Sequence, residues 1–124
     1  MHTGNRVRGV NTEEFDQIVL NDKATVVVDF WASWCGPCRR LAPSYEAVAK
    51  ELGDGLTFLS VDVDAEPALA QRFRVLSIPT IKFFRSGQDV ATHVGGASTD
   101  ELRATLLEWQ GQPAPVGVGA VLSR

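Results

Sequence analysis

The segment from Thr25 to Leu52, TVVVDFWASWCGPCRRLAPSYEAVAKEL, decides how this chain folds. Its first residues are β-branched or aromatic and are apolar on both sides of a strand, which is typical of a central parallel strand with helices on both faces. Behind the two cysteines, apolar residues recur at helical spacing, at Leu41, Tyr45 and Val48. We therefore predict a strand that delivers a thiol pair to the N-terminus of an amphipathic helix.

The flanking sequence adds further strands and helices. A short strand is expected at 7–10, and the spacing of Asn11 and Glu14 predicts a capping box that begins a helix. After the central segment, a β-rich run at 56–63 is followed by a short helix that begins near Pro67. This alternation predicts an α/β fold with a parallel sheet covered on both faces.

The last third of the chain has a different pattern. Two short β-rich runs at 80–84 and 89–94 favour an antiparallel hairpin. Ser98 and Glu101 then form a second capping box for a helix that ends near Gln110.

Length and composition limit the organisation and the partners. A chain of 124 residues has the size of one domain, which we assign to residues 1–110. Residues 111–124 are rich in Gly, Pro and Ala, and we expect a flexible tail there. The 12 basic and 15 acidic residues give no basic excess that would attract nucleic acid. No segment has the apolar length of a membrane span or of a secretory signal, so we expect a cytoplasmic monomer without a membrane partner.

Cys35 and Cys38 are the candidate reactive groups. A thiol reacts as the thiolate, and a helix N-terminus or a nearby cation such as Arg39 lowers its pKa. The three-residue spacing places an attacking thiol, Cys35, and a resolving thiol, Cys38, in one turn of helix. Pro37 suits this first turn, where its fixed φ stiffens the ring that the two thiols can close.

Two other uses of a C-x-x-C motif compete with redox chemistry. A zinc site needs four ligands, but the sequence has no second C-x-x-C, and its only histidines are His2 and His93. A purely structural disulfide across so short a loop would remove little entropy from the unfolded chain. We therefore expect no metal.

Asp29 is a third candidate for the site. Three valines precede it and Phe30-Trp31 follows it, which favours burial of its carboxyl group. Burial would raise its pKa and let it act as a general base or acid for Cys38 through water. The alternative is an ordinary acid at a strand end that reaches solvent.

Taken together, these motifs resemble thioredoxin. The segments VVVDFWA, WCGPC, RRLAP, SIPT and HVGG occur in the order of that family, over about Val7 to Trp109. The resemblance implies a thioredoxin fold, with a central mixed sheet of three parallel strands and an antiparallel hairpin flanked by four helices. The Gly36-Pro37 pair is similar to that of reducing thioredoxins, and differs from the Gly-His pair of protein disulfide isomerase and the Pro-Tyr pair of glutaredoxins.

The resemblance also implies an activity. Such a protein reduces the disulfides of client proteins through Cys35, with resolution by Cys38. It binds no cofactor and is recharged with electrons from NADPH through a separate thioredoxin reductase. A binding module of the same fold, which would use the docking surface and not the thiols, is the alternative. An oxidase or isomerase is disfavoured by the Gly-Pro pair.

Family resemblance assigns further residues around the cysteines. Pro79 matches the family's cis-proline, although sequence alone favours a trans bond. We expect the backbone beside it to pair with an extended client segment. The residues that match the apolar docking surface are Trp34, Gly36, Ile78, Val94 and Gly95.

Ser60 departs from the family pattern. Many thioredoxins carry at this position a lysine that pairs with the buried acid, whereas Ser60 is uncharged. The resemblance therefore leaves the proton route at Asp29 open.

Overall fold

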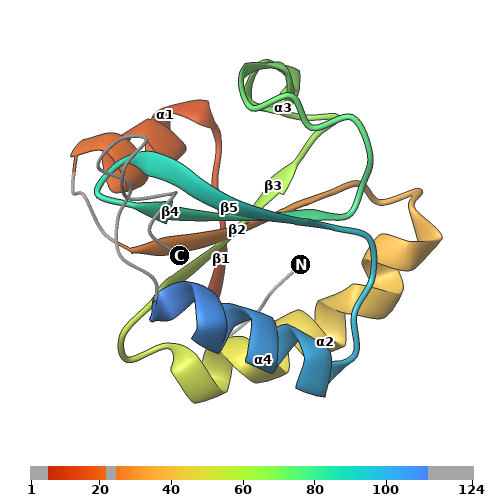
Figure 1. Cartoon of the computed structure of the whole chain (residues 1–124). Helices are drawn as coiled ribbons and strands as arrows, with labels where there is room; N and C mark the ends of the chain where they lie inside the picture. The colour runs from red at the N-terminus through yellow and green to blue at the C-terminus, as the bar shows by residue number, and fades with distance from the viewer. Residues whose placement is uncertain (1–5, 22–24, 112–124) are drawn as a thin grey trace, which may run out of the picture.

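The computed structural model describes residues 6–21 and 25–111, which form a five-stranded sheet between two layers of helices (Figure 1). Residues 1–5, 22–24 and 112–124 lie outside the described residues, and with them nearly all of the tail predicted at 111–124. The expectations for that tail therefore stay predictions.

The sheet has β2 at its centre. Its strand order is β1-β3-β2-β4-β5, so β2 has β3 on one side and β4 on the other. The first three strands are parallel to one another, and β4 and β5 form an antiparallel hairpin. This confirms the predicted mixed sheet. The strands are β1 Val7–Gly9, β2 Val26–Trp31, β3 Thr57–Asp62, β4 Thr80–Arg85 and β5 Gln88–Val94.

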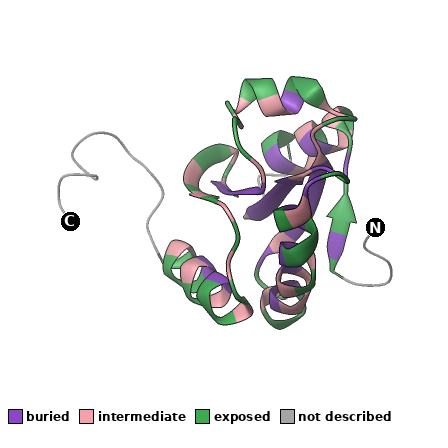
Figure 2. Ribbon diagram, turned by 90° about the vertical axis from the view of Figure 1, so that its right-hand side faces the viewer, coloured by how far each residue is buried: buried purple, intermediate pink, exposed green. Residues whose placement is uncertain are grey.

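Helices cover both faces of the sheet. In Figure 1, α1 and α3 lie above the sheet and α2 and α4 lie below it. Figure 2 shows that the buried residues lie on the strands and on the helix sides that face them. Each face therefore has its own apolar core. The α-helices that the structure describes are α1 Thr12–Phe15, α2 Gly36–Leu52, α3 Pro67–Arg72 and α4 Thr99–Gln110.

Both predicted capping boxes are present, at Asn11 with Glu14 and at Ser98 with Glu101. The first helix differs from the expected one, because after α1 the chain continues as a π-helical segment, η1 Asp16–Asn21. The apolar face continues through this change, since Phe15 of α1 and Val19 of η1 are both fully buried in the same core.

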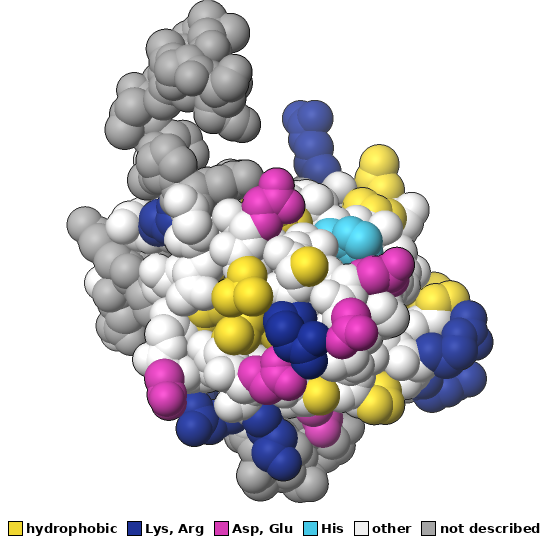
Figure 3. Space-filling view, turned by 60° about the horizontal axis from the view of Figure 1, so that its bottom comes forward, with side chains coloured by type: hydrophobic (Ala, Val, Ile, Leu, Met, Phe, Trp, Pro, Cys, Tyr) yellow, Lys and Arg dark blue, Asp and Glu magenta, His cyan; other side chains and the backbone are white. Residues whose placement is uncertain are grey.

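The outer surface of α2 and α4 carries acidic and basic side chains interspersed with one another (Figure 3). Arg103 of α4 forms ion pairs with Glu51 of α2 and, at 2.7 Å, with Asp100. These exposed pairs tie the two helices together at their surface, and each contributes little to stability because water screens it.

Candidate active site

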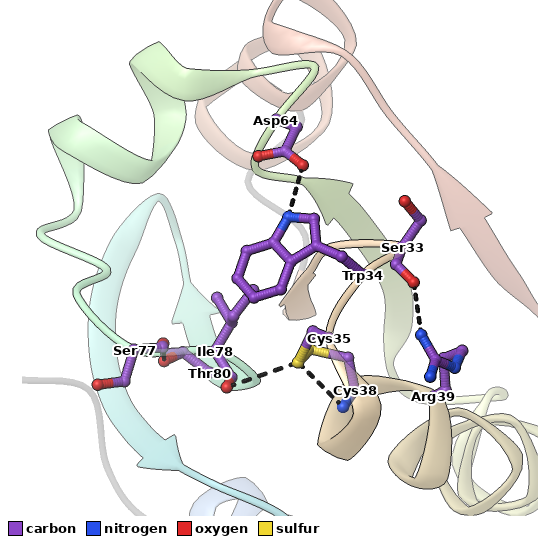
Figure 4. Close-up of a disulfide and its surroundings, with 9 residues drawn as sticks. All are labelled: Ser33, Trp34, Cys35, Cys38, Arg39, Asp64, Ser77, Ile78 and Thr80. Carbon is purple, nitrogen blue, oxygen red and sulfur yellow. Dashed lines mark hydrogen bonds between the residues drawn. A yellow bond between two sulfur atoms is a disulfide. The ribbon is translucent and has the colours of Figure 1, made fainter.

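The cysteine pair follows the carboxyl end of β2 and lies at the N-terminus of α2. Cys35 and Cys38 form a disulfide with their Cα atoms 5.2 Å apart (Figure 4). Cys35 is the N-cap of α2, and its Sγ accepts a hydrogen bond from the backbone N–H of Cys38 at 3.2 Å. Pro37 lies in the first turn, as predicted. In the reduced protein this N–H and the helix dipole would stabilise a thiolate on Cys35.

The two sulfurs face different surroundings. Cys35 Sγ lies 3.8 Å from the carbonyl oxygen of Ile78, beside the exposed indole of Trp34 (Figure 4). Cys38 lines a small, partly open cavity together with Asp29. The geometry therefore places Cys35 on the side that a partner can approach, and Cys38 next to the buried acid.

Arg39 is held by a backbone group. Its guanidinium donates a hydrogen bond to the carbonyl oxygen of Ser33 at 2.7 Å (Figure 4). The bond braces the loop that leads from β2 to Cys35. The influence of this cation on the Cys35 thiol stays a prediction.

Asp29 is buried, with 2% of its surface exposed, which confirms the prediction of burial and excludes the solvent-exposed strand end. Burial alone raises the pKa of Asp29 to about 7. Its Oδ1 has no hydrogen-bond partner within the described part of the chain. Asp29 lines a cavity of about 70 Å³ together with Cys38 and Trp31, which is room for more than one water molecule.

Ser60 lies directly beside Asp29, because the two residues are register partners on β3 and β2. Ser60 is itself buried, so the departure from the family pattern puts a small neutral side chain next to the acid. Burial is the cause of the raised pKa of Asp29, because the charged carboxylate is removed from water.

Tyr45 is a residue near the acid that sequence reasoning assigned only to the core. It is fully buried on α2, and its hydroxyl lies 3.0 Å from the carbonyl oxygen of Val27 and 2.7 Å from that of Leu59. Burial, and secondarily the charge of Asp29, raise the pKa of Tyr45, so the group stays a neutral phenol. The signal in the sequence was a tyrosine at a position on the apolar face of α2, because a buried tyrosine hydroxyl needs a hydrogen-bond partner.

The Ile78-Pro79 peptide bond is cis, which confirms the expectation from the family and corrects the one from sequence alone. Gly95 donates its N–H to the carbonyl oxygen of Pro79 at 2.8 Å, so the end of β5 is fixed beside this bond. Gly95 has a φ of 102°, a conformation that side chains with a Cβ rarely adopt. Val94 next to it is 58% exposed.

Trp34 is held by a residue that sequence reasoning missed. Its indole N–H donates to Oδ2 of Asp64 at 2.8 Å, although 66% of the side chain is exposed (Figure 4). The two residues are 30 positions apart, so no local pattern indicated the pair. The structure thus brings Trp34, Ile78 and Cys35 together, with Gly95 joined to them through Pro79.

Within residues 6–21 and 25–111, no three His, Cys, Asp or Glu side chains come together in a way that could hold a metal ion. Over the same residues, none of the helices is both long enough and apolar enough to cross a bilayer.

Comparisons with known proteins agree on one family. The thioredoxin family model matches residues 6–108. The thioredoxin of Mycolicibacterium smegmatis is 49% identical over 101 residues, which cover 80% of this chain and 90% of the relative. That of Mycobacterium bovis is 45% identical over 99 residues, covering 80% and 85%. A solved thioredoxin of Malassezia sympodialis, Mala s 13, has a TM-score of 0.76 at 36% identity and covers 87% of this chain and 96% of its own.

Proposed function

The chain belongs to the thioredoxin family and is a protein-disulfide oxidoreductase, and we propose that it works as a reductase of client disulfides. The observation that carries this proposal is the position of Cys35 Sγ at the α2 N-terminus, where a backbone N–H at 3.2 Å favours the thiolate. A stabilised thiolate increases the fraction of Cys35 that is present as the nucleophile near neutral pH, and so favours its attack on a client disulfide.

The proposed reaction has two exchange steps. The Cys35 thiolate attacks one sulfur of a client disulfide, so that a mixed disulfide forms and the client S–S bond breaks. The leaving client sulfur takes the electron pair and a proton. Cys38 then attacks Cys35 Sγ, which closes the Cys35–Cys38 disulfide and releases the second client thiol. In total the client gains two electrons and two protons, and this chain loses them.

Asp29 is assigned to proton transfer at Cys38. The second step requires the Cys38 thiol to lose its proton, and the cavity shared by Asp29 and Cys38 has room for water between them. An acid with a pKa of about 7 can accept a proton near neutral pH and return it. This role rests on the cavity and on the unpartnered Oδ1 atom.

The oxidised chain needs two electrons before its next cycle. We assign their supply to NADPH through a separate thioredoxin reductase, with no cofactor bound to this chain. The partners are then that reductase and disulfide-containing client proteins, and the carrier works as a monomer. A cytoplasmic location fits this assignment because thiols are kept reduced there.

Coupled reduction of insulin tests the proposal. With NADPH and a thioredoxin reductase, the wild type is expected to reduce insulin disulfides with consumption of NADPH. Cys35→Ser should be inactive, and Cys38→Ser should accumulate a covalent adduct with the client. Full activity of Cys35→Ser, or none in the wild type, would instead favour a binding module that does not use its thiols.

A further inference from the structure

A guanidinium group lies over the first turn of α2, beside the residue that separates the two cysteines. Side chains on a helix point back towards its N-terminus, so Arg40 reaches over Gly36, four positions before it. A Cβ atom on Gly36 would lie 3.5 Å from Arg40 Nη1. Arg40 is exposed to solvent. A positive charge therefore stands at the edge of the ring that Cys35 and Cys38 close.

This side of α2 faces the segment that follows β5. Ser44, one helical turn after Arg40, accepts a hydrogen bond from Thr99 Oγ1 at 2.9 Å, at the start of α4. Gly95 and Gly96 lie in the same segment, and a Cβ atom on either would meet no atom within 4 Å apart from its chain neighbours. Arg40 therefore lies on a side of the site where open space leaves room for a client.

Arg40 has no acidic partner among the residues that the structure describes. The first turn of α2 contains no acidic side chain. On α4, Asp100 is paired with Arg103 at 2.7 Å, and Glu101 accepts the backbone N–H of Ser98 at 2.9 Å. The acids of the neighbouring helix are thus engaged elsewhere, and the charge of Arg40 is available to a partner.

The opposite side of Cys35 is acidic. Asp64 lies beyond the indole of Trp34 and accepts its N–H at 2.8 Å (Figure 4). Asp62 adjoins it, because its Oδ1 accepts the backbone N–H of Asp64 at 2.9 Å. The two sides of the site therefore carry charges of opposite sign, and an acidic side chain of a client is favoured on the α2 side alone.

We propose that Arg40 is a specificity residue, which pairs with an acidic side chain of the client within two residues of the attacked cysteine. The inference rests on the proposed reductase function and names a class of client for it. The whole chain has a formal net charge of −3 and would on average repel such a client, so the attraction is local to the edge of the disulfide. A guanidinium suits this contact because it can bind a carboxylate through two parallel hydrogen bonds.

Peptides with one cysteine test this preference. The cysteine is presented as a mixed disulfide with 2-thiopyridine. The Cys35 thiolate attacks the peptide sulfur and releases the thiopyridine, whose absorbance gives the rate. Each of the two positions on either side of the cysteine carries in turn aspartate or, as the uncharged reference of the same shape, asparagine, with serine elsewhere.

At an ionic strength of about 0.1 M, we expect aspartate to react about threefold faster than asparagine at one of these positions, as an exposed ion pair allows. At about 1 M, where the screening length is about 3 Å, the two peptides should react alike. Equal rates at the lower ionic strength, or a faster asparagine peptide at every position, would overturn the inference.

Variants of Arg40 assign the preference to this side chain. The ratio of the aspartate rate to the asparagine rate is compared, because a change in the reactivity of Cys35 affects both peptides equally. Arg40→Gln should bring the ratio to about one, and Arg40→Glu should reverse it. An unchanged ratio in Arg40→Gln would refute the assignment.

Lys50→Gln is the matched control. It removes the same charge from the last turn of α2, about 15 Å along the helix from Arg40, and should keep the wild-type ratio. An equal loss of preference in Lys50→Gln and Arg40→Gln would show that net charge, and not a contact at the disulfide, sets the rates.

The asparagine peptides separate failure of this inference from failure of the proposed function. A wild type that reduces the asparagine and aspartate peptides equally fast is still a reductase, and only the acidic preference is refuted. A wild type that reduces neither peptide would refute the reductase itself.

Discussion

The buried carboxyl of Asp29 makes the stability of the oxidised protein depend on pH. Its pKa is about 7 in the folded state, against 3.8 for an ordinary aspartate. Between these values the folded protein holds a proton that the unfolded chain has released, so stability falls as pH rises through this window. A difference of about three pKa units means that the unfolding free energy is about 4 kcal/mol lower above pH 7 than it is below pH 3.8.

Asp29→Asn removes the charge and keeps the shape. We therefore expect the variant to be more stable than the wild type by up to about 4 kcal/mol at pH 8, and by close to nothing at pH 4. Urea unfolding of the oxidised proteins at pH 4, 5.5, 7 and 8 measures this difference. Asp54→Asn is the control, because the Asp54 side chain is fully exposed and its variant should follow the wild type.

The refuting result would be a stability difference between wild type and Asp29→Asn that does not change from pH 4 to pH 8. It would mean that Asp29 titrates in the folded protein as it does in the unfolded chain. The proton role assigned to this residue would then lose its physical basis, even if the variant were slow in the resolution step.

Three other perturbations probe the structure around the site. Tyr45→Phe should lower the unfolding free energy by about 1–2 kcal/mol, because the variant loses a buried hydroxyl whose one O–H donates to the carbonyl oxygens of Leu59 and Val27. Chemical denaturation would show an unchanged midpoint if this donation contributes nothing. Arg74→Gly should stabilise the fold by up to about 1 kcal/mol, since glycine adopts a φ of 55° without strain. A lower midpoint of thermal unfolding in the variant would contradict this expectation. Gly95→Val should slow the reduction of insulin much more than that of a small aromatic disulfide, because the open space beside Gly95 is where a client would pack. Equal slowing of both substrates would argue against docking there.

The elements that the sequence predicted well depend on interactions within a few residues. The two capping boxes join residues three positions apart, and the apolar spacing of α2 can be counted along the chain. The all-apolar flanks of Asp29 likewise indicated a central strand and a buried acid. The first helix was the least accurate element, because nothing in its residues signalled the change to the π-helical turns of η1.

The sequence by itself determined the thiol pair, its place at a helix N-terminus and, through the resemblance, the family. Only the tertiary structure decided which sulfur faces a partner and which faces the acid, because Ile78 and Cys35 meet across 43 residues. It also decided that Asp29 is buried beside the neutral Ser60, and that Asp64 holds Trp34. These are contacts between distant segments, and the free energy of such a contact depends on what the rest of the fold packs around it.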